Sequence, residues 1–489
     1  MKLDRFNKIK VSLISFAIVL LVGVLSAVRP EFLVVLIGVI VYVSLVILFT
    51  NENNIKKVLP PFFVIILFQD TIIRNVELYS NNLGTLISYI DEGVLLIWLT
   101  SFIVRLFRGK LLNGKSILFI LIIILTLGFI SCLINDVPFN IAIPGAFLFV
   151  KGLLYLCLFA NISFNESDIK RYVKSIKIVS IIVLLFAIVD LVFWQQLRTL
   201  LHTDYKIEFR AGVINLQSLF IHPGIYGWFM VFIGTYTIAA TKVKMQYKYL
   251  NATVVFFSFA LLSFRFKAML GIISILFFLY LLNGTKKVIA FSIPFVMILL
   301  VGWLIAGNYI AELTEMTLQR YVFVDMYDSA RNALYQVSIL IGKNEFPFGA
   351  GFGRYGSFTA RSQYSPVYYE YGMDTIWGLT PDKPDFATDT YWPSVIGEIG
   401  FIGMFVMAML FVYLAIKLLK KFKSVEKQNL QSFILFAGFT FVYSMIESLG
   451  EPIYNSAPQN VFIFITVGIA WSLLNHSKVI THNHQTVKD

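Results

Sequence analysis

Two cations lie between apolar runs, where a membrane protein rarely places charge. Arg265 and Lys267 interrupt the stretch "LLSFRFKAMLGIISILFFLYLL", and each flanking run has about fifteen residues, barely enough to cross a bilayer. A hairpin in the outer leaflet, or two short spans that meet there, would hold both side chains near the outer boundary. Charges at membrane depth usually face a polar cavity or an anionic partner. We therefore expect an anion site, although both side chains could instead snorkel to the interface.

Two further polar residues precede this pair, in "EFRAGVINLQSLFIHPGIYGWFM". Arg210 lies just outside a predicted span, and the fixed fork of guanidinium donors suits phosphate oxygens. His222, followed by Pro223 and Gly224, marks the turn into that span. A lone histidine at a helix start is more often structural than catalytic. We consider Arg210 a candidate for the reacting centre and His222 a candidate substrate contact.

A third cation, Lys151, lies in the middle of the apolar run "GAFLFVKGLLYLCLF". An ammonium group inside a span needs a charged partner or a watery cavity. Asp190 or Glu447 could supply the opposite charge, but the sequence does not pair them. Lys151 is therefore a candidate substrate contact with an unassigned partner.

Carboxylates gather where the longest polar segment returns to an apolar run, in "PDKPDFATDTYWPSVIGEIGFIGMF". Asp389 lies just before the predicted span and Glu398 lies within its first turns. The dipole of a helix favours acids near its N-terminus, so stability alone could explain one of them. A carboxylate beside a cationic pocket is also what a hydroxyl nucleophile needs as a general base. Asp389 and Glu398 are alternative candidates for that base.

The stretch "FPFGAGFGRYGSF" contains Gly351-x-Gly353-x-x-Gly356, the spacing that binds dinucleotides in soluble enzymes. A dinucleotide fingerprint must follow a strand and open a helix in a βαβ unit, whereas this motif falls in a long loop between spans. We expect the glycines to allow tight turns and close chain packing. Arg354, inside the motif, is a candidate phosphate contact.

No metal site and no disulfide framework are expected. The histidines are scattered, Cys132 and Cys157 fall inside apolar runs, and the chain has no Asp-x-Asp pair of the kind that holds a divalent ion on a nucleotide-sugar. This pattern disfavours nucleotide-sugar donors.

The elements that must position these residues are transmembrane helices. The chain has 489 residues, of which 58% are hydrophobic and only 14% charged, outside the range of soluble domains. The prediction is an all-α, polytopic integral membrane protein with about fourteen spans. The net charge of +12 comes from Lys and Arg in short loops, as the positive-inside rule predicts, rather than from nucleic-acid binding, and it places both termini in the cytoplasm. The predicted spans are 11–28, 32–49, 58–73, 86–104, 116–134, 141–160, 178–194, 223–241, 250–264, 268–282, 288–306, 396–416, 430–449 and 459–474.

One outer segment is far longer than the others and carries most of the polar, Tyr-rich sequence. A structureless connection of this length would be unusual, so we expect a small folded cap. The range from Ile310 to Ile341 is predicted helical, and Ser357 to Thr388 mostly loop. The resulting regions are 1–194, N-terminal spans; 195–306, spans with the arginine-bearing segments; 307–395, the large extracytoplasmic loop; and 396–489, C-terminal spans and tail.

Part of this pattern resembles a known family, the O-antigen polymerase and O-antigen ligase superfamily of bacterial envelope glycosyltransferases. The resemblance covers roughly residues 205 to 416, while the earlier spans match only in hydropathy. Its most specific features are an arginine-led amphipathic helix that ends in Pro-x-Gly-x-Gly-x-Gly and an acid-bearing start of the next span. The matching pieces are "FRAGVINLQSLFIHPGIYGWFM", "LLSFRFKAML", "YDSARNALYQVSILIGKNEFPFGAGFGRYG" and "TDTYWPSVIGEIGFIG".

The resemblance implies glycosyl transfer at the outer face of the bacterial inner membrane, from a glycan carried on undecaprenyl pyrophosphate. In a polymerase, the growing chain moves en bloc onto the non-reducing-end hydroxyl of a fresh lipid-linked repeat, without metal, nucleotide or other cofactor. Arg210 and Arg265 match family arginines expected to hold the pyrophosphate, and Arg331 matches the arginine that begins the loop helix. The implied partners are the lipid-linked oligosaccharide, membrane lipid, and flippase and chain-length regulator proteins.

One departure from the family pattern favours a polymerase over a ligase. Ligases carry a histidine where the loop returns to the membrane, whereas this chain has Asp389 and no histidine between 307 and 395. The expected mechanism is direct displacement at the anomeric carbon, with Arg210 and Arg265 stabilising the departing pyrophosphate. A ligase-type transferase remains an alternative. So does a transporter or flippase of lipid-linked glycans, which usually shows two similar halves.

Overall fold

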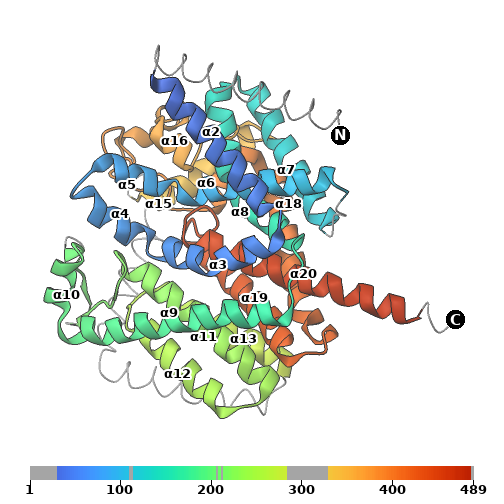
Figure 1. Ribbon diagram of the computed structural model, residues 1–489. Coiled ribbons are helices and arrows are strands. Elements are labelled where there is room, and N and C mark those ends of the chain that lie inside the picture. The colour runs from blue at the N-terminus through green and yellow to red at the C-terminus, as the bar shows by residue number, and fades with distance from the viewer. Residues whose placement is uncertain (1–29, 110–113, 205–206, 211–212, 284–328, 486–489) are drawn as a thin grey trace, which may run out of the picture. The chain divides into compact units, whose positions relative to one another are not determined.

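The computed structural model describes residues 30–109, 114–204, 207–210, 213–283 and 329–485, and this part of the chain is dominated by helices (Figure 1). Its strands are two short, antiparallel pieces in which Phe209 pairs with Ile214. The elements are α2 (Pro30–Phe49), α3 (Glu52–Leu67), α4 (Gln69–Glu77), α5 (Asn81–Ser88), α6 (Ile90–Phe107), α7 (Lys115–Ile134), α8 (Phe139–Ala160), α9 (Glu166–Val192), α10 (Trp194–Leu200), β1 (Phe209–Arg210), β2 (Val213–Ile214), α11 (Pro223–Lys244), α12 (Tyr247–Leu261), α13 (Phe266–Asn283), α15 (Ala330–Asn344), α16 (Phe358–Ser362), α17 (Pro366–Glu370), η2 (Met373–Thr375), α18 (Trp392–Lys421), η3 (Phe422–Ser424), α19 (Gln428–Glu447) and α20 (Gln459–Gln485).

The described helices include several that could cross a bilayer. Six are long and apolar enough by themselves, namely α7, α8, α9, α11, α18 and α19, and the count rises to eight if each of two bent helix pairs is one span. The pairs are α2 with α3, bent by 109°, and α5 with α6, bent by 41°. The all-α prediction is therefore confirmed, and a membrane protein is indicated. The number of fourteen spans stays a prediction, and the predicted spans 11–28 and 288–306 lie outside the described residues.

The chain divides into two compact units, residues 1–57 with 94–111, and residues 58–93 with 112–489. Within the first unit, the Ser101 hydroxyl donates a hydrogen bond to the Val46 carbonyl at 2.9 Å. Arg105 forms an ion pair with Glu52 at 2.9 Å. All the candidate site residues lie in the second unit.

The centre of the second unit is α11, whose residues are buried along most of its length. It packs against α12 and α19, while α20 packs against both α8 and α19 (Figure 1). Aromatic rings fill the interfaces: Phe462 of α20 contacts Phe229 and Phe232 of α11, with ring centroids 6.4 and 5.6 Å apart. Because such packing fixes the helices along their length, their ends are held in place relative to one another.

Local sequence explains where the key helices begin and bend. The N-cap of α11 is His222, and Pro223 follows at its first position, where its fixed φ and missing N–H are tolerated. In α18, Gly400 has φ 71° and ψ −175° inside the helix, a conformation essentially confined to glycine. A Cβ at Gly400 would lie 2.4 Å from the Phe348 carbonyl. The break therefore lets another chain segment approach the backbone of α18.

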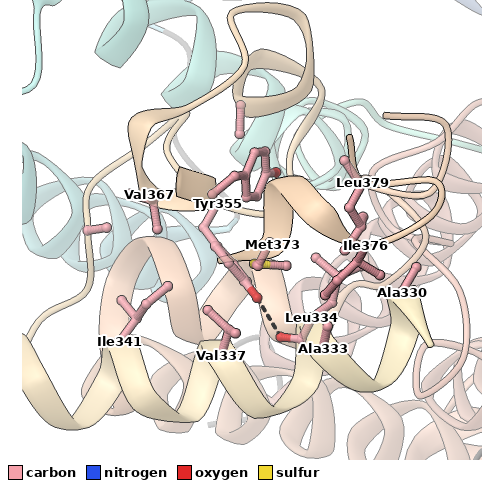
Figure 2. Close-up of a cluster of buried hydrophobic side chains, with 14 residues drawn as sticks. Ala330, Ala333, Leu334, Val337, Ile341, Tyr355, Val367, Met373, Ile376 and Leu379 are labelled. Atoms are coloured by element: carbon pink, nitrogen blue, oxygen red, sulfur yellow. Dashed lines mark hydrogen bonds between the residues drawn. The ribbon is translucent and has the colours of Figure 1, made fainter. Parts of the chain in front are cut away.

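Residues 330–387 contain a hydrophobic cluster built on α15 (Figure 2). Tyr355 is fully buried there, and its hydroxyl donates a hydrogen bond to the Leu334 carbonyl at 2.7 Å (Figure 2). Helix α15 packs against α18. It occupies the described part of the predicted helix 310–341 and continues to Asn344, while α16, α17 and η2 are short helical turns within the range predicted as mostly loop. The cluster consists of Ala330, Ala333, Leu334, Val337, Ile341, Ala350, Tyr355, Ala360, Val367, Tyr368, Met373, Ile376, Leu379 and Ala387.

Candidate functional site: a charged cluster at one end of the second unit

The structure brings Arg265 and His222 together between the ends of α11 and α12. The Arg265 Nη2 lies 3.3 Å from the His222 Nε2 and donates to both Glu208 carboxylate oxygens, at 2.9 and 2.8 Å. The Gly224 amide donates to His222 Nδ1 at 3.0 Å, which assigns the proton of a neutral ring to Nε2. Two donor groups then face each other across 3.3 Å, and an anionic oxygen could accept from both.

Lys267 lies beside this pair at the start of α13. Its ammonium nitrogen is 3.1 Å from the position of a Cβ on Gly224, so a side chain at that residue would meet it. Lys267 forms an ion pair with Glu451, and the Lys267 Nζ is 3.9 Å from the Oε1 of Glu447 at the end of α19. Glu447 is buried, with a side chain 1% exposed. The two cations that the sequence places between apolar runs therefore share one polar site.

A second ion pair belongs to the same site. Arg331, in the first turn of α15, donates to the Asp389 carboxylate at 3.0 Å. Burial raises the pKa of the Asp389 carboxyl above its ordinary value, and Glu451 adds to this shift, while Arg331 and Lys267 act to lower it. Asp389 is therefore within electrostatic range of the Lys267–Glu451 pair.

The turn after α19 holds these elements together. The Trp392 indole N–H, three residues after Asp389, donates to the Ser448 hydroxyl at 2.9 Å. The Tyr335 hydroxyl, one helical turn after Arg331, donates to the Leu449 carbonyl. Both hydrogen bonds fix the segment 329–392 onto the turn that carries Glu451. The charged cluster is defined by Glu208, His222, Arg265, Lys267, Arg331, Asp389, Glu447 and Glu451.

A buried ion pair supports the backbone that leads into His222. Asp190 of α9 and Arg198 of α10 are fully buried, and the Arg198 Nε donates to Asp190 at 3.0 Å. The same carboxylate accepts from the backbone amides of Gln217 and Ser218, at 2.8 and 3.0 Å. A carboxylate with this many donors fixes the path of the chain because releasing any of them would leave a buried polar group unpaired.

Glu398 lies outside the charged cluster and binds the glycine-rich loop, residues 350–356. It is fully buried, and its Oε1 accepts from the backbone amides of Gly353 and Tyr355, at 2.9 and 3.4 Å. The amides of Ala350 and Gly351 donate to the carbonyls of Gly397 and Glu398 in the broken part of α18, at 2.7 and 3.0 Å. The loop is therefore anchored by Glu398 and by carbonyls released next to Gly400.

The remaining amides of this loop are also engaged. Those of Phe352 and Gly356 donate to the Cys132 sulfur and the Tyr368 hydroxyl, both at 3.1 Å, and that of Arg354 donates to the Gly351 carbonyl at 3.3 Å. Every amide from 350 to 356 thus has a partner within the chain, which leaves none to cradle a nucleotide phosphate. The Arg354 side chain is half-buried in this loop.

Lys151 forms a separate buried group. It donates to Asp91 at 2.8 Å and to Glu92 at 2.6 Å, both at the start of α6. Neither of the partners considered from sequence is correct, because Asp190 binds Arg198 and Glu447 lies near Lys267. Of Arg210, only the backbone in β1 is described, where it pairs with Val213, so its predicted role at the anion site lies outside the described side chains.

Sequence reasoning missed two of the acids that face the cations, Glu208 and Glu451, and offered the third, Glu447, as a partner of Lys151 rather than of Lys267. Glu447 had a detectable signal, since it is a carboxylate at the end of an apolar span. Glu208 and Glu451 had none, because they are ordinary polar residues of segments that flank spans. Among the described residues, no group of three or more His, Cys, Asp or Glu side chains is placed to hold a metal ion.

Comparison of the sequence with models of protein families and with curated proteins finds no match. The resemblance to the polymerase and ligase superfamily therefore stays a prediction. Chemically, the cluster offers guanidinium, ammonium and imidazole donors beside several carboxylates. Such a set suits an oxyanion ligand and a proton transfer next to it.

Proposed function

We propose that the protein is a polysaccharide polymerase of the O-antigen or capsule type. It would transfer a growing glycan from undecaprenyl pyrophosphate to the non-reducing-end hydroxyl of a lipid-linked repeat unit, without metal. The observation that carries the proposal is the convergence of Arg265, His222, Lys267 and the Arg331–Asp389 pair at one end of a bundle of apolar helices.

The donor groups fit the leaving group of this reaction. A diphosphate gains negative charge as the sugar departs, and donors preorganised around it stabilise that charge. Arg265 Nη2 and His222 Nε2 lie 3.3 Å apart, and Lys267 lies next to the turn that holds the histidine. Arg210, on the strand next to Glu208, is expected to join them.

The cations of the cluster are paired with carboxylates of the chain itself. Glu208 accepts from Arg265, and Glu451 pairs with Lys267. These oxygens occupy positions that phosphate oxygens would take, so pyrophosphate binding requires Glu208 to move aside.

Asp389 is the carboxylate best placed to accept the acceptor's proton. It lies at the cationic cluster, and its raised pKa suits a base more than an ordinary carboxyl does. Glu398 is less suited, because its Oε1 is bonded to loop amides. The segment 329–391 would cover the reacting atoms and exclude water, which competes as a nucleophile.

The charges at the helix ends also indicate how the protein is oriented in the membrane. The charged cluster lies at the ends of α11 and α19 that the positive-inside rule assigns to the outside, while lysine-rich ends such as Lys420–Lys421 face the cytoplasm. We therefore place the protein in the bacterial inner membrane, with both termini in the cytoplasm and the site facing outward.

The test is chain extension by the purified protein with a defined lipid-linked repeat, in buffer without added metal or nucleotide. Arg265→Ala and Arg210→Ala are each expected to reduce extension by about 10²–10³-fold, the effect of losing one donor to a developing oxyanion. Arg171→Ala, at an exposed arginine of α9, is the matched control. Normal glycan ladders from both site variants would refute the proposal.

A further inference from the structure

A second charged group lies at the opposite ends of α11 and α19. Lys177, Lys244 and Lys248, from α9, α11 and α12, place their ammonium nitrogens 5.4, 5.1 and 5.2 Å from the centroid of the Tyr249 ring. Lys177 also lies 5.1 Å from the centroid of the Tyr236 ring. Helix α11, with 22 residues, is about 33 Å long, so this lysine–tyrosine cluster is remote from Arg265 and its neighbours.

The cations of this cluster are not balanced by ion pairs among the described residues. Within the described part of the chain, neither Lys177, Lys244 nor Lys248 forms an ion pair. The Lys244 Nζ donates instead to the neutral Asn429 amide oxygen at 2.6 Å and to the Tyr249 hydroxyl at 3.3 Å.

The carboxylate of this network, Glu166, is already shared. It accepts from the Asn429 side chain at 2.7 Å and forms ion pairs with Lys170 at 3.0 Å and Lys427 at 3.2 Å. In the described part of the chain, Glu166 is thus the carboxylate that this network contacts, and it balances the charge of the lysines only in part.

The helix ends do not remove this imbalance. The C-terminus of α11 favours Lys244 through its dipole, but Lys177 and Lys248 belong to other helices. Helix α12 begins at the cluster, and its N-cap Gln246 makes no side-chain capping bond, so this end adds positive potential. A ring attracts a cation over its face, yet one tyrosine cannot offset the mutual repulsion of the ammonium groups around it.

We propose that the lysine–tyrosine cluster binds a phosphate-bearing anion, either the headgroup of an anionic phospholipid or free phosphate. Phosphate oxygens accept several hydrogen bonds at once, and an ammonium group can direct its donors freely toward them. The cluster lies at the ends of apolar helices that could span a membrane, where basic pockets between helices meet lipid headgroups.

The experiment uses the full chain and two sources of phosphate. Thermal unfolding and native mass spectrometry are measured in nanodiscs of phosphatidylcholine alone or with phosphatidylglycerol, and in phosphatidylcholine with inorganic phosphate or with chloride at equal ionic strength. A higher Tm with retained phosphatidylglycerol supports a lipid headgroup, and a higher Tm with inorganic phosphate supports a free anion. The same Tm under all conditions, with no retained anion, overturns the proposal.

A charge-matched pair of variants localises the effect. The triple variant Lys177→Gln, Lys244→Gln, Lys248→Gln is expected to bind the effective anion about 100-fold more weakly than wild type. The control replaces the exposed Lys420, Lys421 and Lys423 with Gln, and its anion-induced shift in Tm should equal that of wild type. An equal loss in both triple variants would show a general charge effect and refute the site. If the first variant does not fold, the Tm and anion retention of the wild-type protein in the different nanodiscs still test the proposal.

Discussion

Replacing the buried Glu398 separates its structural role from a catalytic one. The Oε1 of Glu398 accepts from the Gly353 and Tyr355 amides at 2.9 and 3.4 Å. Glu398→Ala leaves these amides without the acceptor, and an unsatisfied buried group costs about 1–3 kcal/mol. Because one of the bonds is long, we expect a total of about 2–4 kcal/mol, a large share of the 5–15 kcal/mol that typically stabilises a fold.

Glu398→Gln keeps an oxygen in the same place to accept from both amides, so the expected loss of stability is only about 1 kcal/mol. We therefore expect the glutamine variant to unfold within a few degrees of wild type and to extend glycan chains at a similar rate. Asp389→Asn removes the proposed base, so extension should fall by about 10²–10⁴-fold at an unchanged Tm. Glu370→Ala, at an exposed carboxylate of α17, is the control for both measurements.

Two measurements on detergent-purified protein check this reasoning, tryptophan-monitored thermal unfolding and chain extension per folded molecule. If the Tm of Glu398→Ala equals that of wild type, the anchoring role of Glu398 is refuted. Assignment of the base is refuted if Glu398→Gln abolishes extension at a normal Tm while Asp389→Asn remains active. The unfolding result does not depend on the proposed reaction.

Three further predictions concern the ion pairs. Lys151→Ala leaves buried carboxylates unpaired and should destabilise the protein by about 3–5 kcal/mol, and adding Asp91→Asn should recover part of the lost Tm. Activity should rise with pH as Asp389 loses its proton. Because the Arg331 guanidinium lowers the pKa of Asp389, Arg331→Ala should move this rise to higher pH. A shift of the rise to lower pH would contradict the assignment of Asp389 as the base. Glu208→Gln removes the carboxylate that occupies Arg265, so the KM for the lipid-linked donor should fall, and an increase in KM would show that Glu208 assists binding.

Much of the helical framework was predictable, because apolar runs and clustered lysines identify helices and their ends directly. The positions of Arg265 and Lys267 between two such runs also predicted a shared polar environment. Their partners were not predictable from spacing. Glu208 is 57 residues from Arg265 along the chain, and only tertiary packing brings the two together.

For buried charged residues, the sequence predicted the position but not the groups that they bind. Glu398 was predicted as a candidate base because it lies in the first turns of a span, and its burial agrees with the apolar run around it. What it binds depends on the break at Gly400, and a glycine in an apolar helix does not by itself predict a break. The same holds for Lys151. Its need for a partner was evident from the sequence, but only the tertiary structure identifies Asp91 and Glu92 as the carboxylates that accept from it.

The two groups of donors in this protein show why a glycine-rich motif and an anion site need not coincide. In the loop from Ala350 to Gly356 every amide is engaged by the chain itself, and the Oε1 of Glu398 accepts from two of these amides, those of Gly353 and Tyr355. At the charged cluster, in contrast, Arg265 Nη2 donates to a side chain, the Glu208 carboxylate, and a side chain can exchange its place with a ligand oxygen more easily than a buried backbone segment can. A ligand site in such a chain is therefore indicated less by the glycine motif than by charged donors whose acceptors are side chains.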